Sequence, residues 1–246
     1  MITRNGIYLE SVPSTQVYLM DLDEKDALEE FTYVYTYKQS AGRGQGDHKW
    51  ESEDGKNICF SLLLKPYFIN PAEQYVITKI ISLAIAEVLA QLGLRDVKIK
   101  WPNDIYVKEN KICGILVQNK ILGSELSSVY VGIGLNVNQK KFIFAPNPTS
   151  LVLETGKVFD KENLLCLLVD RIAAKYLAFK NNELKSIDAD YLSNLLFFDT
   201  FRNYEYLGKI ISAKITGVNE YGHLILEDKK SNHIVAELRE LRFLFG

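Results

Sequence analysis

Cysteine is scarce in this sequence. The 246 residues include only 3 cysteines, Cys59, Cys113 and Cys166, and no two of them have the C-x-x-C spacing. So few and so widely separated cysteines suggest neither a zinc-binding motif nor a disulfide framework. We therefore expect three reduced thiols, as is usual in a cytoplasmic protein.

An excess of positive charge is also missing. Lys and Arg total 29 against 31 for Asp and Glu, which gives a formal net charge of −2. Proteins dedicated to nucleic acid normally carry a clear basic excess. The charge balance therefore argues against a nucleic-acid binder, and we expect no DNA partner.

No segment is apolar for long enough to cross a membrane. The N-terminal residues 1–8 lack the apolar core of a signal peptide. The longest apolar stretch, residues 77–92, is interrupted by polar and charged side chains that include Lys79 and Glu87. We expect no membrane partner and a cytoplasmic location.

Hydrophobic periodicity predicts regular structure along most of the chain. Apolar residues at helical spacing indicate helices over residues 73–92, 161–179 and 188–196, and a short helical pattern follows the turn at residues 12–15. Strands are predicted over residues 31–37, 57–64, 97–100, 105–107, 112–117 and 129–137. The turn at Glu109 and Asn110 favours a hairpin between two of them.

The pattern changes after about residue 199. Short strands are predicted over residues 210–215, 223–226 and 234–238, with no helix between them. This order predicts an α+β fold, with a mixed sheet flanked by helices and a small C-terminal β-barrel. We place the catalytic domain at residues 1–198 and the barrel at residues 199–246.

A glycine-rich segment, residues 39–46, directly follows a predicted strand. Glycine lets a backbone approach a ligand closely and present N–H groups to an anion, and Arg43 adds a guanidinium that can grip a phosphate or carboxylate. The segment matches neither a P-loop nor a dinucleotide-binding fingerprint. A mobile surface loop is the alternative interpretation. Trp50, just beyond it, is either a stacking surface for a base or a core residue.

A second polar cluster follows the predicted strand at residues 97–100. Asn103 and Asp104 can hold a hydrated Mg²⁺ or a ribose, although both residue types also stabilise turns without any ligand. Lys111 is expected near the same turn, and Gly114 would leave room for a ligand beside it. Glycine weakens a strand, so such glycines suggest the close approach of a substrate.

Taken in order, these motifs resemble those of biotin–protein ligases. The resemblance runs from about Ser11 to the C-terminus, and the K-W-P-N-D motif followed by K-x-x-G is its most specific part. The motifs are Ser14-Thr15, Gln39-Ser40-Ala41-Gly42-Arg43-Gly44, Lys100-Trp101-Pro102-Asn103-Asp104, Lys111-x-x-Gly114 and Gly132-x-Gly134-x-Asn136.

The resemblance implies a catalytic domain similar to class II aminoacyl-tRNA synthetases, with a small SH3-like C-terminal barrel. It also implies two half-reactions. The carboxylate of biotin attacks the α-phosphorus of ATP to give biotinyl-AMP and pyrophosphate, and a lysine of a biotin carboxyl carrier protein then attacks this mixed anhydride. Mg²⁺ accompanies the ATP.

The resemblance also implies a role for each matching residue. Arg43 and Lys111 are implied to be catalytic, which suits a reaction that brings two anions together and needs positioning more than an acid–base pair. Asp104 is the candidate metal ligand. The residues implied to bind biotin are Ser14, Thr15, Gln39, Gly42, Arg43, Lys111 and Gly114. The residues implied to bind ATP are Arg43, Gln45, Trp50, Lys100, Asn103, Asp104 and Asn136.

The chain departs from the family pattern between Gln45 and His48. Many members have a second arginine in place of Gln45 and a further Gly and basic residue in place of Asp47 and His48. Fewer fixed charges would loosen the grip on the adenylate. We therefore expect other donors, such as backbone N–H groups, to retain it.

Some family members carry an N-terminal DNA-binding domain and repress transcription. Only 13 residues precede Ser14 here, so we expect the short form without a repressor role. A lipoate–protein ligase and a non-enzymatic biotin-binding module are the alternatives. Exposed strand edges of the catalytic sheet are expected either to pair two copies as a homodimer or to dock the carrier.

Overall fold

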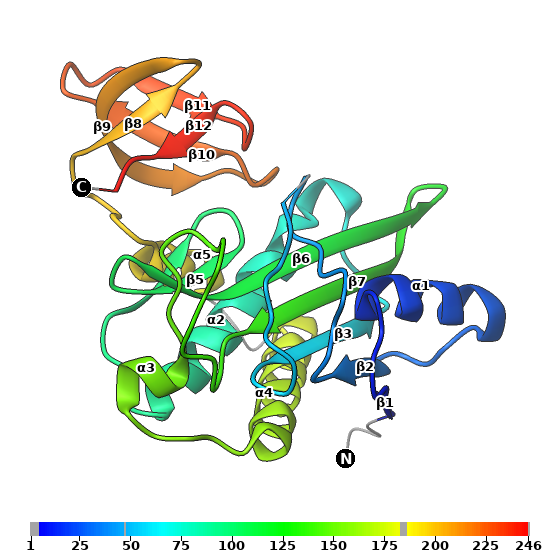
Figure 1. Cartoon of the computed structure of the whole chain (residues 1–246). Helices are drawn as coiled ribbons and strands as arrows, with labels where there is room; N and C mark the ends of the chain where they lie inside the picture. Colours follow the sequence, from blue (N-terminus) through cyan, green and yellow to red (C-terminus); the bar gives the residue numbers. More distant parts are fainter. Residues whose placement is uncertain (1–4, 47, 183–185, 246) are drawn as a thin grey trace.

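A computed structural model describes residues 5–46, 48–182 and 186–245. Its larger sheet has seven strands in the order β1-β2-β3-β7-β6-β5-β4 (Figure 1). The β1–β2 pair is parallel and the other pairs are antiparallel, so the sheet is mixed. The strands are β1 (Gly6–Tyr8), β2 (Tyr33–Thr36), β3 (Ile58–Leu64), β4 (Val97–Lys100), β5 (Asp104–Val107), β6 (Asn110–Leu122) and β7 (Glu125–Leu135).

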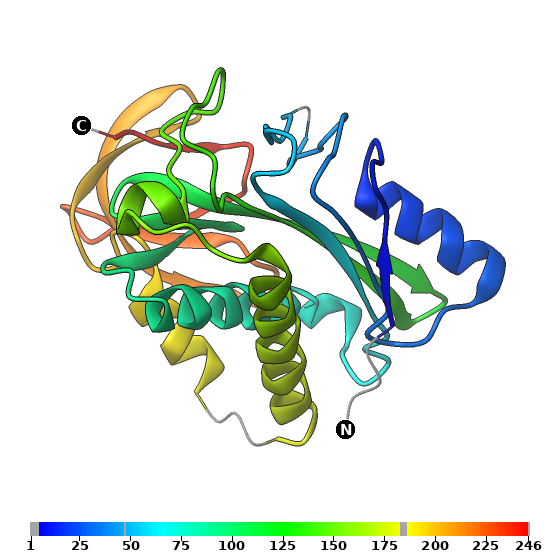
Figure 2. The same ribbon diagram turned by 60° about the horizontal axis from the view of Figure 1, so that its bottom comes forward.

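Helices cover both faces of this sheet (Figure 2). They are α1 (Thr15–Asp26), the 3₁₀ turn η1 (Pro71–Glu73), α2 (Tyr75–Gln91), α3 (Leu151–Thr155), α4 (Lys161–Lys180) and α5 (Ile187–Asn194). Helix α2 is apolar almost all round because it lies between the sheet, α4 and α5. Helix α1 is capped at its N-terminus by Ser14, whose side chain accepts a hydrogen bond from the Val17 N–H.

The alternation of side chains along each strand divides the core into two layers. In β3, Leu62 and Leu64 belong to the large cluster that includes α2 and α4, whereas Leu63 belongs to a smaller cluster with Leu19 of α1. This division follows from the two-residue period of a strand. Helix α1 therefore covers the face opposite to α2 and α4.

The face that α1 only partly covers carries small residues. Asp104 pairs with Gly114, Gly114 with Gly134, and Gly134 with Cys59, in one row across four strands. Two residues back along β7, and on the same face, Gly132 pairs with Ser61. Because glycine and serine project little from a sheet, this row leaves room for other groups above it.

The C-terminal residues form a second, five-stranded antiparallel sheet in the order β11-β10-β9-β8-β12. The described strands β11 and β12 lie at its two ends and do not pair, so this sheet is not a closed barrel. The predicted fold class is otherwise confirmed. The strands are β8 (Arg202–Tyr206), β9 (Lys209–Val218), β10 (Leu224–Asp228), β11 (His233–Ala236) and β12 (Leu241–Phe243).

The two sheets meet at the K-W-P-N-D turn. The Trp101 indole N–H donates to the Gly222 carbonyl at 2.8 Å, and the rings of Tyr106 and Phe245 stack at 5.7 Å between centroids. The domain boundary proposed between residues 198 and 199 falls in the connection between α5 and β8.

Most of the predicted elements are confirmed, including the hairpin of β5 and β6. Strand β6 extends beyond both of its predicted ends, whereas β7 runs over Glu125–Leu135 rather than 129–137, and the two form a long hairpin. Strands β1, β8 and β12 and helix α3 were not predicted because they are short or polar. Across the described residues, no helix combines the length and the apolar character that a membrane span requires.

Candidate functional site

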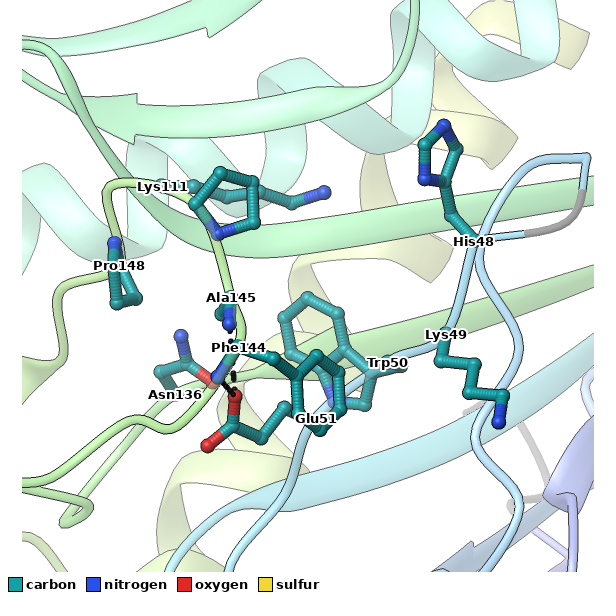
Figure 3. Close-up of a pocket in the computed structure, with 10 residues that line it drawn as sticks. His48, Lys49, Trp50, Glu51, Lys111, Asn136, Phe144, Ala145 and Pro148 are labelled. Carbon is teal, nitrogen blue, oxygen red and sulfur yellow. Dashed lines mark hydrogen bonds between the residues drawn. The ribbon is translucent and has the colours of Figure 1, made fainter.

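A cavity of about 300 Å³ opens beside the row of small residues (Figure 3). Two segments border it. We call residues 39–51 the glycine-rich loop and residues 143–148 the wall segment. Both project from the same side of the sheet in Figure 2. The cavity is lined by His48, Lys49, Trp50, Glu51, Lys111, Asn136, Phe144, Ala145, Pro146 and Pro148.

The indole of Trp50 lies directly on the strand glycines. A Cβ atom at Gly114 would approach its Cζ3 to 3.0 Å, and one at Gly134 would approach its Nε1 to 2.6 Å. The Nε1 atom is buried and has no hydrogen-bond partner among the described residues. Trp50 is thus half-buried against the floor of the cavity, with its Nε1 turned toward Gly134 and Cys59 of the sheet rather than toward the opening.

Three charged residues meet at the turn between β4 and β5. The Lys111 ammonium is 2.7 Å from Asp104 Oδ1 and 5.6 Å from the centre of the Trp50 ring. Burial lowers the pKa of Lys100, the Asp104 carboxylate opposes this shift, and Lys111 adds to it. The turn therefore concentrates positive charge beside the cavity, with one carboxylate to balance it.

Two asparagines at the site differ in the hydrogen-bonding atoms that remain without a partner among the described residues. Asn136 is buried; its Nδ2 donates to the Thr149 carbonyl at 3.0 Å, but its Oδ1 has no partner among the described residues. A buried acceptor without a partner costs free energy, so Asn136 is well suited to accept from a ligand. The Asn103 amide instead donates to the Ile115 carbonyl, which agrees with the turn-stabilising interpretation.

The residues expected on the biotin side form a polar group at the start of α1. The Thr15 N–H donates to Gln39 Oε1 at 2.9 Å, and the Thr15 hydroxyl lies 2.8 Å from the Ser61 hydroxyl. A Cβ atom at Gly42 would lie 2.9 Å from Gln39 Nε2 and 2.7 Å from the Trp50 carbonyl oxygen. Gly42 thus allows this group and Trp50 to approach each other, and Ser14 is buried at the helix cap.

Arg43 and Gln45 lie on the exposed part of the glycine-rich loop. Their side chains make no hydrogen bond or ion pair with the other residues that the structure describes, so both are available to a ligand. Gly46 has a φ of +63°, which favours glycine at this turn. Asp47 lies outside the described residues, and His48 is exposed at the mouth of the cavity.

The side chains at this site provide few ligands for a permanently bound metal ion. No three His, Cys, Asp or Glu side chains gather as a possible metal site within the described ranges. Asp104 supplies a single carboxylate, one oxygen of which already faces Lys111. Mg²⁺ held by one carboxylate together with substrate phosphates would fit this arrangement, whereas an all-protein site would not.

Sequence reasoning missed several residues at the site. Gln16 donates to the carbonyls of Leu116 and Tyr130 at 3.2 and 3.1 Å, and it occupies the space above Gly132. The sequence suggested that a substrate approaches the strand closely at such glycines; at Gly132 the side chain of Gln16 occupies this space instead. Glu51 and Ser61 were also missed, since a lone polar residue in a loop or buried strand carries no spacing signal.

Comparison with known proteins gives consistent results. Residues 8–136 match the profile of the biotin/lipoate A/B protein ligase family. The bifunctional ligase/repressor BirA of Escherichia coli (strain K12) is 31% identical over 229 residues, covering 89% of this chain and 68% of that protein. A biotin–[acetyl-CoA-carboxylase] ligase of Paracoccus denitrificans is 32% identical over 147 residues, covering 57% of this chain and 61% of that protein.

A solved structure resembles the whole chain. The biotin protein ligase from Aquifex aeolicus in complex with biotin and ATP superposes with a TM-score of 0.78 at 27% identity, covering 99% of this chain and 100% of that one.

Proposed function

This chain belongs to the biotin/lipoate A/B protein ligase family, and from that premise we propose how its cavity performs the reaction of a biotin–protein ligase. The enzyme activates biotin with ATP to biotinyl-5′-AMP and transfers biotin to a protein lysine. One observation carries the proposal: Lys111 and Asp104 form an ion pair beside Trp50, at a cavity bordered by the glycine-rich loop.

The first half-reaction joins two anions, the biotin carboxylate and the α-phosphate. In our proposal the Lys111 ammonium and the Arg43 guanidinium reduce their repulsion and stabilise the charge that develops at phosphorus. The polar group at the start of α1 binds biotin through Ser14, Thr15 and Gln39, with Gly42 and Gly114 leaving space for it. No histidine is needed because the carboxylate is already ionised.

The nucleotide occupies the other side of the cavity in this proposal. Trp50 offers its ring to the base, and the unpaired Oδ1 of Asn136 accepts from the nucleotide. Lys100, Asn103, Asp104 and Gln45 lie on the phosphate and ribose side. Asp104 would be the one protein ligand of a Mg²⁺ ion that accompanies ATP, and this ion would help to neutralise the phosphate charge.

The proposed acceptor is the target lysine of a biotin carboxyl carrier protein or of a carrier domain. Strand β1 is one edge of the larger sheet, and an exposed edge can pair with a strand from another chain. The outer side of the other edge strand, β4, is occupied at Ile99 by Leu195 and Leu196. We propose the β1 edge as the place where the carrier docks or a second copy pairs.

The test is biotin-dependent exchange of pyrophosphate into ATP in the presence of Mg²⁺. Exchange that requires biotin, and that lipoate does not support, agrees with the proposal. Exchange with lipoate alone would identify a lipoate–protein ligase. Tight biotin binding without any exchange would identify a binding module.

Replacing the two cations tests their roles. We expect Lys111→Ala and Arg43→Ala each to lower the exchange rate by about 100-fold, because each removes charge stabilisation at the reacting phosphorus. Lys108→Ala, at an exposed position on the same hairpin as Lys111, is the control and should exchange normally. Full activity of both cation variants, with the circular dichroism of the wild type, would refute the assigned roles.

A further inference from the structure

The carboxylate of Glu51 accepts hydrogen bonds from three consecutive backbone N–H groups of the wall segment. Its Oε1 receives the N–H of Ile143 at 2.6 Å. Its Oε2 receives the N–H groups of Phe144 and Ala145, both at 2.9 Å. Figure 3 shows the carboxylate beside the backbone of Phe144 and Ala145, with these hydrogen bonds drawn as dashed lines.

Consecutive N–H groups that converge on one anion form a backbone concavity of the kind that binds anions in proteins. Burial tends to raise the pKa of Glu51, but the three N–H donors outweigh burial and the pKa lies below its usual value. Glu51 is therefore ionised at neutral pH. The contact consists of three charge-assisted hydrogen bonds, which are stronger than neutral ones.

The side chains of the wall segment do little to hold it in place. Ile143 is 91% exposed and Phe144 is 59% exposed, so neither packs into the core. At its C-terminal end the wall segment is attached to strand β6, because the Asn147 carbonyl accepts a hydrogen bond from the Lys111 N–H at 2.7 Å. The part nearest the opening depends on Glu51.

Glu51 thus connects two segments that are far apart in sequence but border the same cavity. It directly follows Trp50, whose ring lies on the cavity floor, and it is itself a lining residue. Phe144, Ala145 and Pro146 of the wall segment line the same cavity. Moving the Glu51 carboxylate would displace both the wall and the end of the glycine-rich loop.

We propose that Glu51 is a positioning residue for ATP, because its carboxylate holds the wall segment in place before the nucleotide binds. This inference rests on the proposed function and adds a residue to it. Glu51 itself takes no part in the chemistry. It reduces the ordering that ATP would otherwise impose on the wall segment, and such ordering weakens binding.

The first measurement separates KM from kcat. In Glu51→Ala we expect the KM for ATP in biotin-dependent exchange to rise about tenfold, with kcat within about twofold of the wild type, since preorganisation contributes to binding. Glu51→Gln keeps one acceptor oxygen and should give a smaller increase. Glu53→Ala is the matched control, because this exposed side chain makes no hydrogen bond to residues 143–145 within the described structure.

The second measurement follows hydrogen exchange of the amides of residues 143–145 in the full chain without substrate. We expect protection in the wild type and in Glu53→Ala, and faster exchange in Glu51→Ala. Faster exchange together with a raised KM for ATP supports the inference. Unchanged exchange, or a KM for ATP equal to that of the wild type, overturns it.

The two proposals fail in distinguishable ways. A wild-type protein without biotin-dependent exchange of pyrophosphate refutes the proposed function, and with it the role of Glu51 toward ATP. If the wild type is active and Glu51→Ala leaves the KM for ATP and the amide exchange unchanged, only the inference about Glu51 is refuted.

Discussion

At the scale of single residues, the site depends on positions without side chains. Gly114 and Gly134 pair across β6 and β7, and the Trp50 ring rests on both of them. Gly132, two residues from Gly134 on the same strand, accommodates Gln16. Glycine in a strand has no side chain to pack and weakens the strand. Here the absence of a side chain at each glycine makes room for one particular side chain above the sheet.

Gly134→Ala should displace Trp50, because the new Cβ would overlap its indole ring. The chain has 2 tryptophans, and the other, Trp101, is buried. We therefore expect tryptophan emission to shift to longer wavelength and ATP binding to weaken. Gly217→Ala is the control, since its Cβ would meet Ile225 at an ordinary 3.4 Å. Unchanged emission in Gly134→Ala would show that the ring does not lie there.

At the scale of elements, α2 brings a charge into an apolar layer. Lys79 is buried on α2, and its ammonium lies 2.7 Å from Asp188 of α5. The rings of Tyr75 and Tyr191 lie 5.7 and 5.9 Å from the same ammonium. The hydroxyls of these tyrosines lie 2.7 Å apart, and Tyr75 donates to the Pro102 carbonyl at 2.9 Å. These contacts link the two helices to the K-W-P-N-D turn.

Asp188→Asn should destabilise this packing. We expect the free energy of unfolding to fall by about 1 kcal/mol, because the buried ammonium loses its anionic partner while Asp188 itself is largely exposed to screening water. Urea denaturation measures the change. Asp190→Asn removes a charge from the same helix but leaves the Lys79 pair intact. Equal stability of the two variants would contradict the role given to the ion pair.

At the scale of the whole molecule, the C-terminal sheet contributes to the environment of the site. Phe243 of β12 lies 4.6 Å from the Lys100 ammonium, measured to its ring centre, and it packs edge-on against Tyr204. Lys100 faces Asp104 across the β4–β5 hairpin. The second sheet therefore helps to bury a lysine that we assign to the nucleotide.

Phe243→Ala should affect both stability and nucleotide binding. Loss of this buried ring is expected to lower the free energy of unfolding by about 3 kcal/mol and to raise the KM for ATP, because Lys100 loses the surface that positions it. Phe201→Ala, which removes a ring that is 44% exposed just before β8, is the control. A wild-type KM for ATP in a folded Phe243→Ala protein would show that the C-terminal sheet does not contribute to nucleotide binding.

The elements with strong local patterns could be predicted from the sequence. Helix α4 begins at Lys161 as expected, and β4 has the predicted bounds of Val97–Lys100, because apolar periodicity and capping act over a few residues. The ends of the long β6–β7 hairpin could not be predicted, since its outer part is exposed, carries no alternating apolar pattern and is defined by pairing between its own strands. The short edge strands β1 and β12 depend in the same way on their neighbours.

The sequence by itself determined the chemistry of this protein: the residue types of K-W-P-N-D, K-x-x-G and the glycine-rich loop indicate where charge, amide groups and open backbone are available. Only the tertiary structure decided how these groups are used. Whether Gly132 admits a substrate or Gln16, and whether Glu51 is solvated or holds the wall segment, depends on residues more than 90 positions apart along the chain. Local propensity carries no information on such contacts, because they form only when the sheet brings the two segments together.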